Sequence, residues 1–246
     1  MSDGARRDGR RAAILALDTA TTQAVIAVGA PDGEPLGASM WPAGYRHGET
    51  LLPNIGRLLG EANIRKSRLR GIVVGTGPGA FTGLRVGLST VKGLALPTDV
   101  PLYVVSSLQA LALDILAAPA ANGSSRAAVT AVPCLDAGKG EVYVAAYVAD
   151  PETLVRETAA DCRIAAGALP DWLAALPAPP PAVAGNGAER HAVAGRLAVA
   201  GPTAVSIGRL ALLQRRRGES ASLATAVPIY GRPPDITVKK APKQVP

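Results

Sequence analysis

Residues 75–95 read Gly75-Thr-Gly-Pro-Gly-Ala-Phe-Thr-Gly-Leu-Arg-Val-Gly-Leu-Ser-Thr-Val-Lys-Gly-Leu-Ala95, a glycine-rich loop that follows an apolar run and opens into a helical pattern. The apolar run predicts a buried strand, and Thr82 is predicted to cap the helix. The helix contains Gly83, Gly87 and Gly93, each of which costs it about 0.5–1 kcal/mol relative to alanine. A sequence that keeps these glycines indicates a close backbone approach, either to a packed neighbour or to a ligand.

The loop does not match the common nucleotide-binding motifs. Leu84-Arg85 follow its last glycine in place of the Lys-Ser/Thr pair of a Walker P-loop, and its glycine spacing does not fit a dinucleotide-binding fingerprint. Free N–H groups at a helix N-terminus can still hold an anion. Gly77, Gly79 and Thr82 are therefore candidate anion-binding residues, and tight helix packing is the alternative.

The same succession of elements occurs twice in the chain. Leu15-Ala-Leu-Asp18-Thr-Ala-Thr21 and Pro133-Cys-Leu-Asp136-Ala-Gly-Lys139 each form an apolar run that ends in Asp, followed by a small-residue turn and a second apolar run. Two such halves predict a duplicated α/β architecture rather than a single wound sheet. A split α/β fold holds Mg-phosphate at this place, so Asp18 and Asp136 are candidate nucleotide-binding residues. A turn-capping aspartate is the alternative for each.

Hydrophobic periodicity predicts the remaining elements. Strands are expected over 12–17, 24–29, 71–75, 100–105, 128–135, 141–149 and from 182 into a turn at 185–187. Helices are expected over 48–59, 82–95, 108–116, 169–176, 188–198 and 203–217, with Ser106 or Ser107 as a cap. Residues 64–70 are expected to form an exposed link and 117–126 a linker. The chain is predicted to divide into four parts. They are a disordered basic tail over 1–11, two subdomains over 12–108 and 109–230, and an irregular tail over 231–246.

The amino-acid composition excludes several classes of protein. The chain has 246 residues, 48% of them apolar, so it can fill a core and is not disordered throughout. Its two cysteines, Cys134 and Cys162, exclude a disulfide scaffold and a four-cysteine zinc site. Aromatic residues make up only 3%, too few for an RNA-stacking sheet. The net charge of +7 permits a polyanionic partner such as RNA but does not identify one.

Basic residues are concentrated in a few segments. The arginines of residues 1–11 precede an apolar run that is shorter than the about 7–15 residues of a secretory signal. No run approaches the roughly 18 apolar residues of a membrane span, so a cytoplasmic protein is expected. Residues 65–70 and 215–217 are expected to be solvated faces rather than RNA sites.

Several motifs resemble the bacterial TsaB (YeaZ) family. They are Ile14-Leu-Ala-Leu-Asp-Thr-Ala-Thr21, His47-Gly-Glu-Thr-Leu-Leu-Pro53 and the loop–helix stretch 75–95, with further matches at 106–111, 136–143 and 228–234. The resemblance covers residues 12–235, and its Phe-Thr-Gly-Leu-Arg motif is highly specific. It implies an α/β, actin/Hsp70-like (ASKHA) duplicated fold of two ribonuclease H-like subdomains with mixed sheets.

The resemblance also implies a function. The family takes part in making N6-threonylcarbamoyladenosine at position 37 of tRNAs that read ANN codons. In it, TsaB is a non-catalytic paralogue that dimerises with the transferase subunit TsaD, while TsaE joins as an ATPase and TsaC supplies threonylcarbamoyl-AMP. No cofactor is expected apart from ATP or ADP at the subunit interface. tRNA is expected to be contacted indirectly, through the complex, and a homodimer is an alternative when TsaD is absent.

Metal and catalytic residues are not expected. The catalytic relative needs a His-x-x-x-His metal site, and Leu51 stands where the second histidine would follow His47. The other histidine, His191, is far away in sequence. A glycoprotease-like (M22) peptidase is therefore disfavoured. A Mg-ATP-dependent phosphotransferase or ATPase that uses Asp18 and Asp136 remains the alternative function.

The family's dimer interface uses two helices that correspond here to about 48–60 and 82–95. The residues that the resemblance assigns to this interface are His47, Glu49, Leu51, Leu52, Ile55, Leu59, Thr82, Gly83, Arg85, Val86, Gly87, Thr90 and Leu94. On this basis Gly87→Leu is expected to abolish TsaD binding with little effect on monomer folding. The chain departs from the family pattern in its basic N-terminal extension, a candidate tRNA contact, in the proline-rich stretch 177–181, and in Lys139, where the family usually has arginine.

Overall fold

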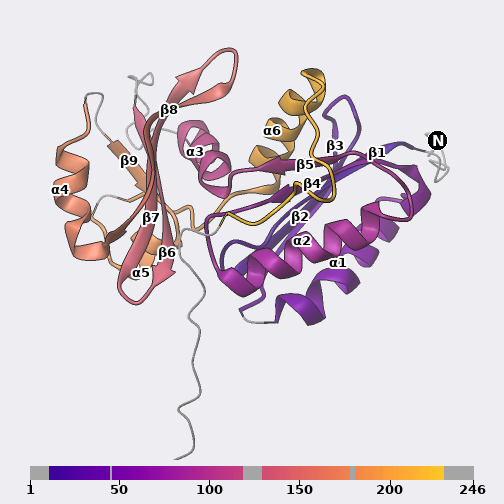
Figure 1. The fold of residues 1–246 in the computed structure, drawn as a ribbon, viewed down its shortest axis with the longest axis horizontal. Helices are drawn as coiled ribbons and strands as arrows, with labels where there is room; N and C mark the ends of the chain where they lie inside the picture. The colour runs from indigo at the N-terminus through magenta and orange to yellow at the C-terminus, as the bar shows by residue number, and fades with distance from the viewer. Residues whose placement is uncertain (1–10, 45, 119–128, 178–180, 195, 230–246) are drawn as a thin grey trace, which may run out of the picture.

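The computed structural model describes residues 11–44, 46–118, 129–177, 181–194 and 196–229 (Figure 1). The expected linker at 117–126 and the tails at 1–11 and 231–246 fall wholly or largely outside these residues. Among the described residues, no helix combines the length and the apolar character needed to cross a lipid bilayer.

The chain forms two mixed sheets that lie side by side (Figure 1). The first has the strand order β3-β2-β1-β4-β5 and the second has the order β8-β7-β6-β9. The strands of the first sheet are β1 (Ala13–Asp18), β2 (Gln23–Gly29), β3 (Pro35–Pro42), β4 (Leu69–Gly75) and β5 (Leu102–Val105). Those of the second sheet are β6 (Thr130–Gly138), β7 (Glu141–Asp150), β8 (Leu154–Ala165) and β9 (Pro181–Ala184).

The two sheets share one topology. In each, three consecutive strands form an antiparallel meander, and the first strand of the meander also pairs in parallel with a later strand. Thus β1 corresponds to β6 and β4 corresponds to β9, and Asp18 and Asp136 lie at equivalent places near the ends of β1 and β6. This arrangement confirms the predicted duplication.

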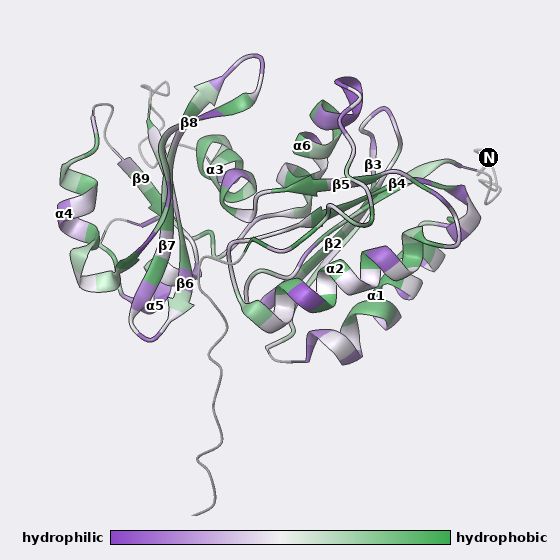
Figure 2. Cartoon of the chain, viewed as in Figure 1, coloured by the Kyte–Doolittle hydropathy of each residue, from purple (hydrophilic) through white to green (hydrophobic). Residues whose placement is uncertain are grey.

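Helices cover the sheets and fill the space between them. They are α1 (His47–Glu61), α2 (Phe81–Ala95), α3 (Ser107–Ala117), α4 (Leu169–Ala174), α5 (Asn186–Arg190) and α6 (Ala204–Arg216). Leucines of α1 pack with apolar residues of β1, β2 and β4 in one core, while α3 and α6 share another core with both sheets. Figure 2 shows the mostly hydrophobic strands of the first sheet enclosed between α1 and α2 on one face and α6 on the other.

Three local predictions were wrong. The strands β3 and β8 were not expected, because each leaves many residues exposed and neither presents the continuous apolar run that marks a buried strand. The helix expected over 188–198 ends at Arg190, and Ala192 adopts a left-handed conformation with φ 51° that stops it. The supposed exposed link at 64–70 contains the buried residues Ile64 and Leu69.

The last described residues return to the first sheet. Helix α6 packs on β1, β2, β4 and β5, the residue Ala221 pairs with Leu102, and the backbone N–H of Ile229 donates to the carbonyl of Thr76 at 2.8 Å. Residues 204–229, which the sequence places in the subdomain 109–230, therefore pack on the N-terminal subdomain. This return brings the C-terminal segment to the glycine-rich loop.

Candidate functional site

The glycine-rich loop and the start of α2 pack directly on the turn that follows β1. A Cβ atom added at Gly79 would lie 2.3 Å from the carbonyl oxygen of Ala20, and one at Gly83 would lie 2.1 Å from that of Thr19. One at Gly87 would lie 2.3 Å from Thr19 Oγ1. The close backbone approach that these glycines permit is therefore to a packed neighbour within the chain.

Thr82 does not cap α2. The helix begins at Phe81 and its N-cap residue is Ala80, which accepts no side-chain hydrogen bond and instead donates its N–H to the carbonyl of Ala20 at 2.7 Å. Thr82 is exposed in the first turn. Packing of the loop on the β1 turn fixes the start of the helix two residues earlier than the capping preference predicts. Gly77, the other candidate in this loop, has φ 100° and lies against Leu84 and Ile229.

Asp18 is a buried structural carboxylate. Its side chain is 1% exposed, Oδ2 accepts a hydrogen bond from Ser107 Oγ at 2.6 Å, and Oδ1 accepts one from the backbone N–H of Ala20 at 2.7 Å. Ser107 Oγ in turn accepts the N–H of Gly77 at 3.2 Å. Burial raises the pKa of Asp18 to about 6. The group thus joins β1, α3 and the glycine-rich loop.

Asp136 occupies the equivalent place in the second sheet but is ion-paired. Its Oδ2 accepts a hydrogen bond from Arg190 Nη1 at 2.9 Å, and its Oδ1 accepts one from the backbone N–H of Gly138 at 3.2 Å. The backbone N–H of Asp136 donates to Asn186 Oδ1 at 3.0 Å. The structure therefore gives the two predicted nucleotide-binding carboxylates separate sets of partners, one in each half of the chain.

His47 is buried at the start of α1, with 3% of its surface exposed. Its Nε2 lies 3.1 Å from the carbonyl oxygen of Thr21, and burial lowers its pKa. Within the described ranges, no group of three or more His, Cys, Asp or Glu side chains is placed to hold a metal ion. The buried imidazole joins α1 to the β1–β2 turn.

The helices expected to bind a partner, α1 and α2, lie beside each other on one face of the first sheet (Figure 1). Six of the residues assigned to the interface are buried in the subdomain: His47, Leu51, Ile55, Leu59, Gly83 and Gly87. The others are exposed or half-buried: Glu49, Leu52, Thr82, Arg85, Val86, Thr90 and Leu94. Arg85 lies over the ring of Phe81, 4.0 Å from its centroid.

Among the exposed residues of these helices, which also include Glu49, Arg57 and Arg85, one group is small or apolar. We call it the α1–α2 surface and define it by Gly48, Leu52, Gly56, Gly60, Val86, Thr90 and Gly93. Leu52 is 52% exposed, and a Cβ added at Gly56, Gly60 or Gly93 would meet nothing within 4 Å. The glycines of α1 were not among the predicted contact residues. Gly48, Leu52, Gly56 and Gly60 follow one another at intervals of four residues, which places them on one face of the helix, and this spacing is the signal that could have found them.

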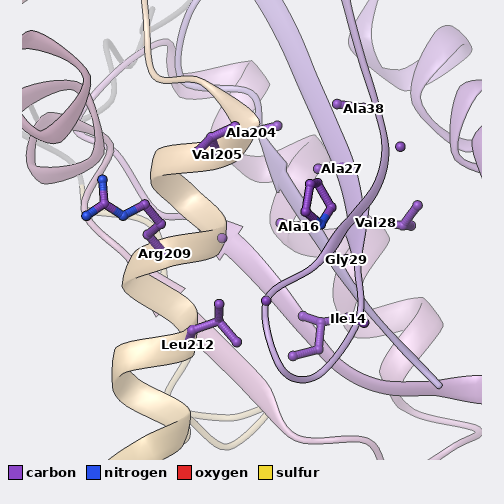
Figure 3. Close-up of a pocket in the computed structure, with 15 residues that line it drawn as sticks. Ile14, Ala16, Ala27, Val28, Gly29, Ala38, Ala204, Val205, Arg209 and Leu212 are labelled. Carbon is purple, nitrogen blue, oxygen red and sulfur yellow. The ribbon is translucent and has the colours of Figure 1, made fainter. Parts of the chain in front are cut away.

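A separate pocket of about 160 Å³ lies between α6 and the strands β1, β2 and β3 (Figure 3). Its walls are apolar, with Ile14, Val28, Val205 and Leu212 among them. Among the described residues that line it, Arg209 is the one titratable residue, and its guanidinium points away from the alanines of the strands (Figure 3). These lining residues therefore offer no nucleophile, acid or base.

Comparison with known proteins places these features in a family. The family model TsaD, tRNA N6-adenosine threonylcarbamoyltransferase, matches residues 42–176, which include both α1 and α2. The tRNA threonylcarbamoyladenosine biosynthesis protein TsaB of Escherichia coli is 34% identical over 137 residues, which cover 56% of this chain. That match spans only 55% of the length of the E. coli protein.

Two other relatives match over nearly all of their length. An uncharacterized protein of Mycobacterium tuberculosis is 31% identical over 223 residues, covering 90% of this chain and 92% of that protein. The structure of YeaZ from Pseudomonas aeruginosa superposes with a TM-score of 0.70 and 28% identity, covering 89% of this chain and 100% of that one. Because the family model matches more than half of the chain, and because TsaB of E. coli and the YeaZ structure are similar to it, the chain belongs to the TsaB (YeaZ) family of tRNA threonylcarbamoyladenosine biosynthesis proteins.

Proposed function

We propose that this chain is a non-catalytic scaffold subunit of the tRNA N6-threonylcarbamoyladenosine transferase complex, and that it binds and activates TsaD through the α1–α2 surface. The observation that supports this most directly is the unpacked row of glycines beside Leu52. Glycine costs a helix interior about 1 kcal/mol relative to alanine. Gly83 and Gly87 offset this cost by packing on Thr19, whereas Gly56, Gly60 and Gly93 have no such contact within the chain.

Small residues let the backbone of a second helix approach closely, and an exposed leucine supplies apolar area to bury. Fully burying a leucine side chain contributes about 1.5–3 kcal/mol, and Leu52 has roughly half of its surface available. The α1–α2 surface is therefore suited to pack against a pair of helices of a partner. The same surface would support a homodimer when TsaD is absent.

The bonding partners of Asp18 and Asp136 support the scaffold role over the phosphotransferase or ATPase alternative. Such an enzyme would need Asp18 and Asp136 to face a bound nucleotide and its magnesium. Both oxygens of Asp18 are hydrogen-bonded in the interior, and Asp136 is neutralised by Arg190. ATP or ADP at the subunit interface and recruitment of TsaE belong, in this proposal, to the assembled complex in the cytoplasm.

The test combines co-purification with a modification assay. We expect the chain to co-purify with TsaD, and expect tRNA to be modified only when this chain, TsaD, TsaE and threonylcarbamoyl-AMP are all present. Gly56→Leu should weaken TsaD binding at least tenfold, because its side chain projects from the surface. Gly208→Leu is the matched control, since Gly208 also lies in a helix with nothing within 4 Å of an added Cβ.

Two outcomes would contradict the proposal. One is unchanged TsaD affinity in Gly56→Leu, measured by calorimetry on a variant whose unfolding curve is native-like. The other is full tRNA modification by TsaD and TsaE without this chain.

A further inference from the structure

A strongly basic surface lies at the end of the first sheet opposite the glycine-rich loop. Four basic residues fall within six positions, in the 3-10 turn Lys66–Arg68 and at the start of β4. We call this surface the basic end and define it by Arg65, Lys66, Arg68 and Arg70. Three of the four are exposed, and Arg68 is partly so. Figure 2 shows hydrophilic residues at this end of the sheet, near the start of β1.

Arg70 points away from the core at the start of β4. In the parallel pairing of β1 with β4, Ala13 is opposite Leu69 and Ile14 is opposite Gly71, so the register shifts at Arg70 and leaves it without a partner residue in β1. Leu69 and Gly71 are both buried while Arg70 between them is exposed, as the alternation of side chains along a strand requires. Arg70 Nη1 donates to the carbonyls of Ser67 and Leu69 at 3.3 and 3.1 Å, and this holds the guanidinium over the turn.

The charge of the basic end is not neutralised by carboxylates within the described part of the chain. None of its four side chains forms an ion pair there. Two carboxylates near this end of the sheet are already paired, because Glu61 pairs with Arg57 at 2.7 Å and Glu34 pairs with Arg11. Arg11 itself belongs to the same end, since it precedes Ala13 by two residues and Ala13 is opposite Leu69. Asp99, in the turn before β5, and Asp32, in the same turn as Glu34, are further carboxylates at this end.

Grouped cations that lack carboxylate partners create a positive potential suited to a polyanion. Arginine presents a planar fork of donors that matches phosphate oxygens, and three of the four residues are arginines. The position is also suitable, because α1 ends at Glu61, four residues before Arg65. A partner seated on the α1–α2 surface would leave the basic end beside it and open.

We propose that the basic end binds the phosphate backbone of tRNA, so that this subunit contacts tRNA directly rather than only through its partner. The proposal rests on the proposed function for the identity of the polyanion. It does not depend on whether TsaD binds the α1–α2 surface.

The test measures tRNA binding and complex formation separately. The fourfold variant Arg65→Gln, Lys66→Gln, Arg68→Gln and Arg70→Gln is compared with a control that removes four exposed arginines elsewhere, Arg156→Gln, Arg163→Gln, Arg196→Gln and Arg209→Gln. Binding of an unmodified tRNA transcript is followed by fluorescence anisotropy from 50 to 200 mM salt, for the chain alone and for the chain with TsaD. Co-purification with TsaD is the second readout.

We expect the fourfold variant to keep its TsaD binding and to lose at least tenfold in tRNA affinity. Each lost phosphate contact should make the slope of log K against log salt shallower by about 0.7–0.9. The control should change little. The proposal would be overturned by an equal loss in the control, which indicates a net-charge effect. It would also be overturned by unchanged tRNA binding in the variant, even if binding to anionic lipid vesicles were lost. Failure of TsaD to co-purify would count against the proposed function instead, and the titration of the chain alone would still decide about the basic end.

Discussion

Gly87 of α2 faces Thr19 so closely that an added Cβ would lie 2.3 Å from Thr19 Oγ1 and 3.4 Å from a methyl group of Leu17. Thr19 is held there, because its hydroxyl donates to the carbonyl of Gly83 at 2.8 Å. The glycine is thus a packing residue between α2 and β1. This contact argues against the expectation that Gly87→Leu would spare the fold of the monomer.

The first prediction concerns this contact. Gly87→Leu should lower the free energy of unfolding by about 1–3 kcal/mol or more, because overpacking displaces the β1 turn. Gly93→Ala is the control on the same helix. Nothing lies within 4 Å of an added Cβ at Gly93, so this change should stabilise the protein by about 0.5–1 kcal/mol. Urea unfolding measures both, and a Gly87→Leu protein as stable as the native one would contradict the assignment.

These two glycines show where prediction from sequence ends. The duplicated fold could be predicted, because apolar runs that end in Asp and the following turns are local signals. The orientation of α2 could not be predicted from Gly87 and Gly93 themselves. A glycine has no side chain that adds to an amphipathic pattern, so whether it faces β1 or solvent depends on how the helix packs. For the same reason, the predicted contact residues of α1 include its leucines but not the exposed glycines Gly48, Gly56 and Gly60.

The second prediction separates two adjacent leucines that sequence resemblance grouped together. Leu51 is 1% exposed and lies in the core under α1, whereas Leu52 is 52% exposed on the α1–α2 surface. Leu51→Ala should cost about 2–5 kcal/mol of stability. Leu52→Ala should change stability by about 0.5 kcal/mol or less, while weakening the binding of TsaD. Thermal unfolding measures the stability of both variants, and calorimetric titration measures their affinity for TsaD. Equal losses of stability in Leu51→Ala and Leu52→Ala would refute the distinction between a core leucine and a surface leucine.

The third prediction concerns the phosphotransferase alternative. Asp136 is bound to Arg190, with side-chain exposures of 17% and 64%, so its loss removes an ion pair in which the arginine is largely solvated. We expect Asp136→Ala to lower stability by about 1 kcal/mol or less. The purified chain, with or without this substitution, should not hydrolyse Mg-ATP above background. Turnover by the native chain that disappears in Asp136→Ala would instead favour an enzyme.

The last prediction follows from Asp18. Its pKa is about 6 in the folded protein, against 3.8 for an unperturbed aspartate, because burial disfavours the ionised carboxylate more than the hydrogen bonds from Ser107 and Ala20 favour it. The folded state therefore binds the proton more tightly than the unfolded state does. The stabilisation is complete below about pH 4 and is lost as the pH rises through about 6.

Asp18→Asn isolates this effect. The amide does not titrate, and it can keep both contacts, because the Ser107 hydroxyl can accept a hydrogen bond where it previously donated one. The native protein should therefore lose stability relative to Asp18→Asn by on the order of 2 kcal/mol between pH 4 and pH 7. Urea unfolding of both proteins across this range measures the difference, in which the titration of all other groups cancels. A difference that stays constant with pH would mean that folding does not raise the pKa of Asp18, and that the hydrogen bonds offset the desolvation of its carboxylate.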